Sequence, residues 1–502
     1  MTTRTKKAVK GTVTGLVQFG VLVILQVLLA PIVLRISGQE VLGAYAIVMQ
    51  IIGYGLILDL GLSVALGRYL AQSFNASNEG IKFTKVFNIG RYFILATNAV
   101  ISIFIMVLSY KIDSLITGSH AIIEDARTGL YLLAAWTILR TPLVLYGHGL
   151  LASQNMAAAN VINLISSISR LALSLYFVFK GFGLIGLVSA NIASELIGLL
   201  LQKHYFNKLY PRLNLQWHWP DMPLLRELFA FGLTYWGVNV ATVLTTGSDS
   251  VIIGHLYGAA AAAIFYTTKI PTFLIIQLIY KISDNAGPAA NELFAQGNFD
   301  ALRSAYLRIL RYSLLLAVPL AIGVVGFNKD IISAWVGVNQ YAGHVMSLAL
   351  ASFVLTQVIS HINAMITLAA GNMRNWMAIS VASGLITFML AYALGKSFGM
   401  QWVMVAIALL DMPVFIFLIR RSFASLGLTY GRALREALLP VILAALPLMA
   451  WAGFVMATEQ AKSLASLITC IAVFSLLWVL GLYILGISKH ERRLIGNKLG
   501  FV

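Results

Sequence analysis

The chain has 502 residues, of which 59% are hydrophobic and only 11% are charged. Soluble domains carry about 25% charged residues, so this composition excludes a water-soluble fold and predicts a polytopic membrane protein. The single cysteine, Cys470, excludes a disulfide framework and a cysteine-based metal site. The net charge of +17 is typical of basic loops on the cytoplasmic side of a membrane, which favours this interpretation over nucleic-acid binding.

Apolar blocks long enough to cross a bilayer recur along the whole chain, and each spanning helix needs about 20 mostly apolar residues. The first block, 11–34, has no charge over 24 residues. It is longer than a signal-peptide core, so we expect an uncleaved span. About fourteen spans are predicted, at 11–35, 41–69, 86–110, 127–150, 157–179, 182–203, 228–252, 257–282, 305–327, 341–369, 375–395, 399–419, 436–457 and 463–488.

The basic residues predict the orientation of these spans. With the amino terminus in the cytoplasm, 25 of the 35 Lys and Arg residues fall on the cytoplasmic side and 7 on the opposite side. The positive-inside rule describes this asymmetry. We therefore expect an even number of spans, with both termini in the cytoplasm.

A short motif recurs at the start of two spans. Residues 15–21 read GLVQFGV and residues 232–238 read GLTYWGV, and a patch of small residues follows each. The offset places spans 1–6 opposite spans 7–12 in the same orientation, as in transporters with parallel repeats. We expect an all-α protein with two six-helix lobes and two added helices. The predicted domains are an N-lobe at 1–205, a cytoplasmic linker at 206–227, a C-lobe at 228–421 and the added spans with a cytoplasmic tail at 422–502.

Polar and ionisable side chains in or beside these spans are the candidate functional residues. An ionised group at the bilayer centre costs at least about 2.5–3.5 kcal/mol, so each needs a partner or water. Lys269 lies two residues before Pro271, which predicts a helix break at Lys269. The candidates for substrate binding are Arg170, Arg140, Lys269, Asn163, Asn239 and Arg35. The candidates for a coupling ion or for ion pairing are Asp249, Asp59, Glu195, Asp411 and His361.

Two interpretations of these residues remain open. Helical spacing puts Asn163 and Arg170 on one polar stripe, and Asn239 and Asp249 on another. The side chains of each stripe either form hydrogen bonds between helices, worth about 0.6 kcal/mol each, or line a hydrated cavity for an anionic substrate. Arginine is a costly means of joining helices, which favours the cavity for Arg170. No cofactor, metal or ATPase motif is apparent, so transport would draw on Na⁺, H⁺ or the substrate's own gradient.

The segment 31–72 resembles the opening of bacterial polysaccharide exporters of the O-antigen flippase type. These belong to a superfamily that includes lipid II flippases and multidrug/toxin extruders. In the second half, 249–254 and 263–266 look like the second-lobe signature, although the family usually has glycine where Ala263 stands. The residues that carry the first match are Arg35, Gly38, Gly43, Tyr45, Asp59, Gly61, Leu62 and Arg68.

The resemblance implies a non-enzymatic transporter in the bacterial inner membrane whose two lobes open alternately to each side. Its substrate would be an undecaprenyl-diphosphate-linked oligosaccharide, moved from the cytoplasmic to the outer leaflet. Its other partners would be membrane lipids and polysaccharide-assembly proteins. Mid-span arginines suit this substrate, because a guanidinium fork binds phosphate oxygens in pairs.

Three alternatives remain. A cation-coupled multidrug exporter would favour a cavity of acidic and aromatic side chains. An integral-membrane enzyme of polysaccharide assembly would need catalytic groups gathered in large loops. A purely structural membrane partner would not need polar stripes on several spans.

Overall fold

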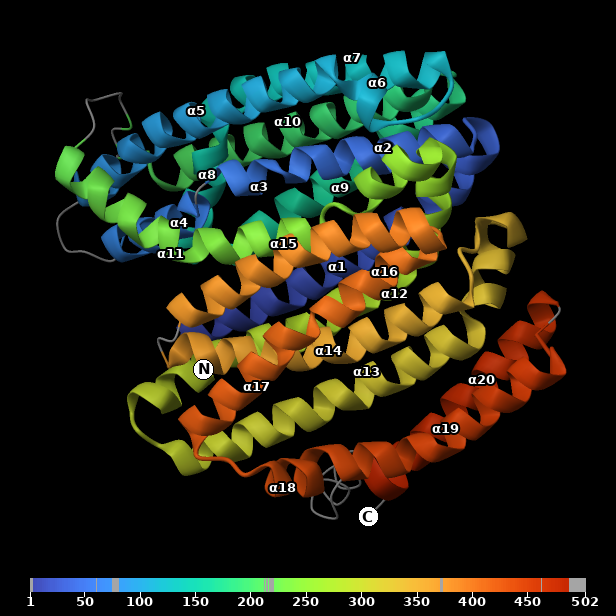
Figure 1. Cartoon of the computed structure of the whole chain (residues 1–502). Coiled ribbons are helices and arrows are strands. Elements are labelled where there is room, and N and C mark those ends of the chain that lie inside the picture. Colours follow the sequence, from blue (N-terminus) through green and yellow to red (C-terminus); the bar gives the residue numbers. More distant parts are fainter. Residues whose placement is uncertain are drawn as a thin grey trace. The chain divides into compact units, whose positions relative to one another are not determined.

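The computed structural model describes residues 3–59, 61–74, 81–211, 213, 215, 221–370, 373–461 and 463–486, and every secondary-structure element within these ranges is helical (Figure 1). The expected all-α membrane fold is therefore confirmed. Part of the predicted linker 206–227, and the predicted cytoplasmic tail beyond residue 486, lie outside the described residues.

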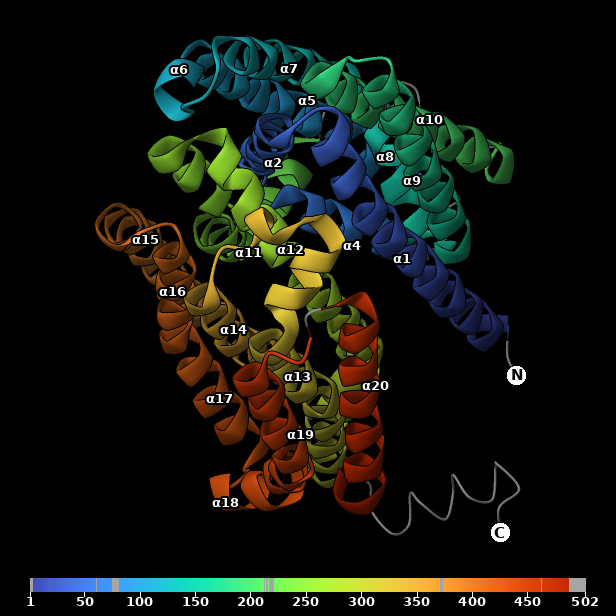
Figure 2. The same cartoon turned by 90° about the vertical axis from the view of Figure 1, so that its right-hand side faces the viewer.

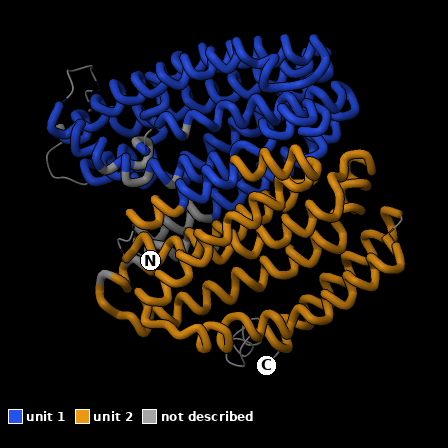
Figure 3. Tube along the Cα trace, in the orientation of Figure 1, with its two compact units in different colours: residues 1–266, 380–388 blue, residues 267–379, 389–502 orange. Residues whose placement is uncertain are grey.

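The chain divides into two compact units (Figure 3). Unit 1 comprises Met1–Tyr266 and Ser380–Phe388. Its helices are α1 (Thr3–Ile36), α2 (Gln39–Gly53), α3 (Gly55–Leu58), α4 (Leu62–Phe74), α5 (Ile81–Tyr110), α6 (Ile112–Leu115), α7 (His120–Leu139), α8 (Thr141–Ala152), α9 (Met156–Phe179), α10 (Gly183–Leu209), α11 (Met222–Thr246) and the first part of α12 (Asp249–Ala295). Unit 1 thus extends past residue 228, where the predicted C-lobe begins. The lobe boundaries themselves stay a prediction.

Unit 2 comprises Thr267–Ile379 and Met389–Val502. It holds the rest of α12, α13 (Phe299–Val336), a 3₁₀ turn (Val338–Gln340), α14 (His344–Ala369), most of α15 (Met373–Phe398), α16 (Gln401–Leu410), α17 (Met412–Leu426), α18 (Tyr430–Ala433), a π-helical turn (Leu434–Leu438), α19 (Leu439–Thr458), α20 (Leu464–Gly481) and a second π-helical turn (Leu482–Gly486). Helix α13 packs against α14 and α19, and α19 packs against α20 (Figure 2).

Within the described residues, eleven helices are long and apolar enough to cross a membrane, or twelve if the bent pair α7 and α8 is one span. The chain is thus a multi-pass membrane protein. The expected span 41–69 is instead divided among α2, α3 and α4. The count of fourteen therefore stays a prediction.

Aromatic packing holds the core of unit 1 together. Phe83 and Phe87 on α5, Tyr146 on α8 and Phe206 on α10 are all buried. The Phe206 ring centroid lies 6.0 Å from that of Phe83 and 5.8 Å from that of Tyr146. Stacked and edge-to-face rings are favourable beyond the area that they bury, so this cluster fixes three helices that also line the candidate site.

The predicted helix break at Lys269 is wrong, because α12 continues through Lys269 and Pro271. The interruption lies at Gly258, whose φ of 87° is left-handed. Thr117, in the turn before α7, accepts a hydrogen bond from the Ala259 N–H at 2.9 Å, and its own N–H donates to the Gly254 carbonyl at 3.2 Å. Backbone groups in a membrane must be satisfied internally, so the break lies where Thr117 supplies partners.

The two small-residue patches that follow the repeated motif meet inside unit 1. A Cβ atom added to Gly43 would lie 1.7 Å from the carbonyl oxygen of Ala259. One turn before Gly43, the Gln39 amide donates a hydrogen bond to the Ala260 carbonyl at 2.9 Å. Small residues permit such close approach between membrane helices, so glycine at position 43 lets α2 and α12 touch backbone to backbone.

Candidate functional site

Arg140 lies where one membrane helix breaks into two. Helix α7 ends at Leu139, α8 begins at Thr141, and the two are bent by 62°. Pro142 stands in the first turn of α8, where it lacks the N–H that would bond to the preceding turn. The bend therefore puts the arginine at a corner of the chain instead of on a straight helix face.

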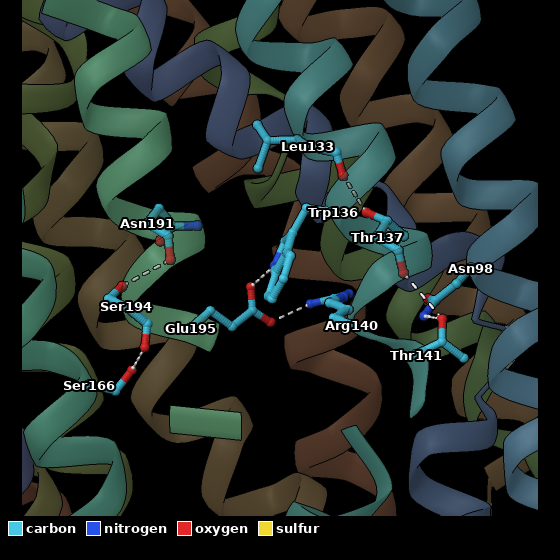
Figure 4. A network of polar contacts seen from close by, with 10 residues as sticks. All are labelled: Asn98, Leu133, Trp136, Thr137, Arg140, Thr141, Ser166, Asn191, Ser194 and Glu195. Carbon is cyan, nitrogen blue, oxygen red and sulfur yellow. Dashed lines mark hydrogen bonds and ion pairs between the residues drawn. The ribbon is translucent and has the colours of Figure 1, made fainter. Parts of the chain in front are cut away.

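The corner is held by an ion pair between α7 and α10 (Figure 4). Arg140 Nη1 donates to Glu195 Oε1 at 2.7 Å, and the indole N–H of Trp136 donates to Glu195 Oε2, also at 2.7 Å. Both partners are partly accessible, with side-chain exposures of 30% for Arg140 and 31% for Glu195. Both carboxylate oxygens of Glu195 are thus engaged, and its charge offsets that of Arg140.

This ion pair forms part of the wall of a cavity of about 450 Å³ inside unit 1. Asp59 lines the same cavity, together with polar side chains from α5 and α10 such as Asn98 and Gln202. Asn98 also donates to the Thr141 hydroxyl at 3.0 Å, which ties α5 to the bend. With two carboxylates against one guanidinium, this cavity is not cationic overall.

Arg170 lines a different cavity of about 260 Å³ within unit 1. Its wall combines polar groups from Gln26, Tyr45, Ser167 and Tyr266 with apolar side chains of α1, α2 and α9. Tyr45 and Tyr266 are the electrostatic neighbours of the guanidinium, and the described residues give Arg170 no ion pair. Its charge is therefore available to an anionic ligand.

The polar stripe on α9 fits both interpretations of the sequence. Asn160 donates to the Thr14 hydroxyl of α1 at 3.2 Å, an interhelical hydrogen bond. Further along the same helix, Ser167 and Arg170 line the cavity. Asn163 lies on the exposed side and accepts a long 3.4 Å bond from Gln202.

In unit 2, two of the candidate residues belong to one chain of polar contacts. The His361 ring bonds to Asp284 at 2.8 Å and stacks on Tyr280 at 3.9 Å between ring centroids. The Tyr280 hydroxyl donates to Gln357 Oε1, and Gln357 Nε2 donates to Asp411 Oδ1, each at 2.9 Å. Asp411 also lies at a break, between α16 and α17, and Pro413 stands at the start of α17.

The remaining candidates occupy separate places. Asp249 is buried at the start of α12, where Gln50 donates to its carboxylate and also accepts from the Ser250 N–H at 2.9 Å, so it joins α2 to α12. Lys269 is buried in unit 2 with its ammonium 5.1 Å from the Phe273 ring. Arg35 is exposed in the last turn of α1, and Asn239 is half-buried in α11.

Sequence reasoning did not single out Trp136, Gln26, Tyr280 or Asp284 as site residues. No local pattern marks them, because each becomes polar lining or a partner only through packing with another helix. Two prolines did carry a usable signal, since Pro142 and Pro413 each follow an ionisable residue by two positions. In the described part of the chain, no group of three His, Cys, Asp or Glu residues is placed to hold a metal ion.

The fold resembles those of known membrane transporters. The lipid II flippase MurJ, in an inward closed conformation, superposes with a TM-score of 0.70 at 14% identity, over 96% of this chain and 100% of that chain. A multidrug resistance MATE family transporter of the MOP superfamily, inward-facing, gives a TM-score of 0.66 at 16% identity, over 83% and 98%. A MOP superfamily transporter from Pyrococcus furiosus gives 0.59 at 16% identity, over 84% and 96%.

No curated protein matches the chain. A family model described as polysaccharide biosynthesis protein matches residues 32–346. That match covers more than half of the chain, from α2 to α13, and it includes all the residues that line the 450 Å³ cavity and Arg170 itself. The expected family is confirmed: the chain belongs to the polysaccharide biosynthesis protein family and has the fold of MOP-superfamily transporters.

Proposed function

We propose that the protein flips a lipid-linked oligosaccharide across the bacterial cytoplasmic membrane, with its diphosphate bound at Arg170. The single observation that carries the proposal is the half-buried guanidinium of Arg170, which faces a cavity and has no ion pair among the described residues. An unpaired arginine in a membrane span is costly. A phosphate that binds the fork bidentately would offset that cost.

The composition of the cavity suits the junction between a sugar-diphosphate head group and its lipid tail. Tyr45, Tyr266 and Gln26 present polar groups, whereas Leu25, Leu29 and other apolar residues complete the wall. The family and the fold support transport as the activity, with undecaprenyl diphosphate as the carrier that the sequence resemblance implies. Alternating access of two lobes, cytoplasmic termini and the absence of enzymatic activity are part of the same proposal.

The other candidates take secondary roles in this proposal. In unit 1, Arg140 contributes a charge only when Glu195 releases it, and Asn163, Asn239 and Arg35 would line the path of the head group. Lys269 would be a candidate cation of unit 2. The chain from Asp284 through His361 to Asp411 would serve a coupling Na⁺ or H⁺. Asp59 and Asp249 would act by ion pairing or helix joining.

Reconstituted flipping tests the proposal. Proteoliposomes would hold a fluorescent polyprenyl-diphosphate saccharide, and a membrane-impermeant quencher would report its arrival in the other leaflet. We expect Arg170→Gln to slow flipping about tenfold to a hundredfold, because charge-assisted hydrogen bonds are worth about 1.5–3 kcal/mol. Arg170→Lys keeps the charge without the fork and should retain part of the activity.

A matched control shows whether Arg170 binds substrate in the cavity or only holds helices together. Lys180→Gln removes one charge from the exposed carboxyl end of the same helix, outside the cavity, and should leave flipping unchanged. Both variants should keep the thermal stability of the wild type. If Arg170→Gln lowers stability but leaves the flipping rate per folded molecule unchanged, Arg170 joins helices and the proposal is wrong.

One observation favours a second candidate, cation-coupled export of small molecules. The 450 Å³ cavity is lined by the two acids Asp59 and Glu195 and by Arg140, and a wall with more acids than arginines suits a cationic guest. A drug-susceptibility panel on a deletion strain decides between them. If the deletion strain becomes more sensitive to cationic drugs but keeps its surface polysaccharide, the function is drug export and not lipid flipping.

A further inference from the structure

A basic pocket in unit 2 lies outside every residue used above. It has a volume of about 350 Å³ and lies between the first turns of α13 and the π-helical turn Leu434–Leu438. Ser304, Arg308 and Arg311 line it from α13, and Arg435, Glu436 and Pro440 line it from the other side. We call it the π-turn pocket.

The backbone explains why two charged residues enter this wall. Pro440 stands in the first turn of α19 and cannot donate to the carbonyl four residues earlier, that of Glu436. The chain takes a π-helical turn immediately before it. Such turns widen a helix and occur frequently at functional sites, and this one places Arg435 and Glu436 beside α13.

The pocket has an excess of positive charge. Glu436 is already paired, because Arg432 Nε donates to its carboxylate at 2.8 Å. Arg308 bonds through Nε to the Ser304 carbonyl at 3.3 Å, and the described residues give neither Arg308 nor Arg435 an ion pair. Arg311 adds a third guanidinium, which stacks near the Tyr312 ring at 5.4 Å. Arg308 and Arg435 therefore supply two guanidinium charges that no described acid pairs, because Glu436 is already bound by Arg432.

Helix length puts the pocket at the membrane surface. Helix α13 has 38 residues, which at 1.5 Å per residue is about 57 Å, against about 30 Å of hydrocarbon. Shared between the two ends, the difference leaves about nine residues beyond the hydrocarbon at each end. Arg308 is the tenth residue of α13 and so lies at the boundary, and the long side chain of Arg311 can reach toward the head groups from one turn further in. The apolar side chains of Leu434, Leu439 and Ile442 beside the pocket are exposed, as a surface along acyl chains would be.

We propose that the π-turn pocket binds the phosphate head group of an anionic phospholipid. Guanidinium forks hold phosphate oxygens in pairs, basic pockets between membrane helices on the cytoplasmic side bind such head groups, and the exposed leucines lie where the acyl chains would continue. The site is separate from the Arg170 cavity, so it does not depend on the proposed function.

Native mass spectrometry of the full chain in a neutral detergent tests the site, with cardiolipin, phosphatidylglycerol and phosphatidylcholine titrated separately. We expect the anionic lipids to be retained and phosphatidylcholine not. Arg308→Gln and Arg435→Gln should each weaken retention about tenfold. The control Arg421→Gln removes one charge from the exposed surface of α17 and should change retention less than twofold.

Three results would overturn the proposal. Unchanged retention in both pocket variants excludes the site. Equal weakening in the Arg421→Gln control shows attraction to net charge only. Preference for undecaprenyl diphosphate over cardiolipin at equal concentration assigns the pocket to the transported lipid instead. Thermal unfolding without lipid checks folding, and both pocket variants should match the wild type there.

Discussion

The ion pair between Arg140 and Glu195 gives a prediction whose size follows from the structure. Glu195→Gln removes the charge but keeps a carbonyl oxygen that can accept from the Trp136 indole, which now bonds to Glu195 at 2.7 Å. The variant therefore isolates the loss of the ion pair. Arg140→Gln leaves the carboxylate of Glu195 without its cation.

The magnitude lies between two limits. Fully buried pairs cost about 3–5 kcal/mol when one partner is removed, and surface pairs about 0–1 kcal/mol. Because both side chains are about a third exposed, we expect each single variant to lose about 2 kcal/mol of stability. The double variant Arg140→Gln/Glu195→Gln should lose clearly less than the sum, with a coupling of about 1–2 kcal/mol.

Unfolding of the purified protein in mixed micelles, followed by tryptophan fluorescence, measures the cycle. Trp136 touches Glu195, so each variant's folded baseline is recorded separately. Additive losses, with a coupling near zero, would refute the reasoning and show that the two charges interact mainly with water. The same variants in the flipping assay then show whether Arg140 acts on substrate beyond holding the bend.

Two further predictions concern helix contacts. Gly43→Val should destabilise the protein by about 3 kcal/mol, since its Cβ would meet the Ala259 carbonyl, whereas Gly53→Val adds a Cβ with nothing within 4 Å and should cost little by thermal unfolding. Tyr280→Phe should cost about 1 kcal/mol by removing the donor to Gln357; an unchanged unfolding curve would show that water replaces the hydroxyl.

The helices were largely predictable because apolar runs of spanning length leave few alternatives. The broken span at Arg140 could also be anticipated from Pro142. The break in α12 could not. Pro271 removes one backbone hydrogen bond, a loss that a long helix tolerates. The helix breaks at Gly258 because Thr117 provides hydrogen-bond partners for the backbone of Gly254 and Ala259. Thr117 is distant in sequence, so no local pattern contains that information.

The sequence indicated which residues belong to candidate sites, but it did not indicate which partner each of them has. Polar spacing on α9 pointed to Arg170, and the structure gives it a cavity. Glu195 had three candidate cations in Arg140, Arg170 and Lys269, and the rotation and packing of α10 decided among them. Sequence spacing fixes which residues share a face, but it does not fix which neighbouring helix that face meets.

The position of Arg140 at the corner between α7 and α8 has a mechanical consequence. A guanidinium on a straight helix would keep its distance from a neighbour during small bending, whereas one at the vertex moves with every change of angle. A change in the 62° bend between α7 and α8 would therefore change the distance between Nη1 and Glu195, two groups that line the cavity. The angle between α7 and α8 therefore affects the charge that a guest in this cavity would meet.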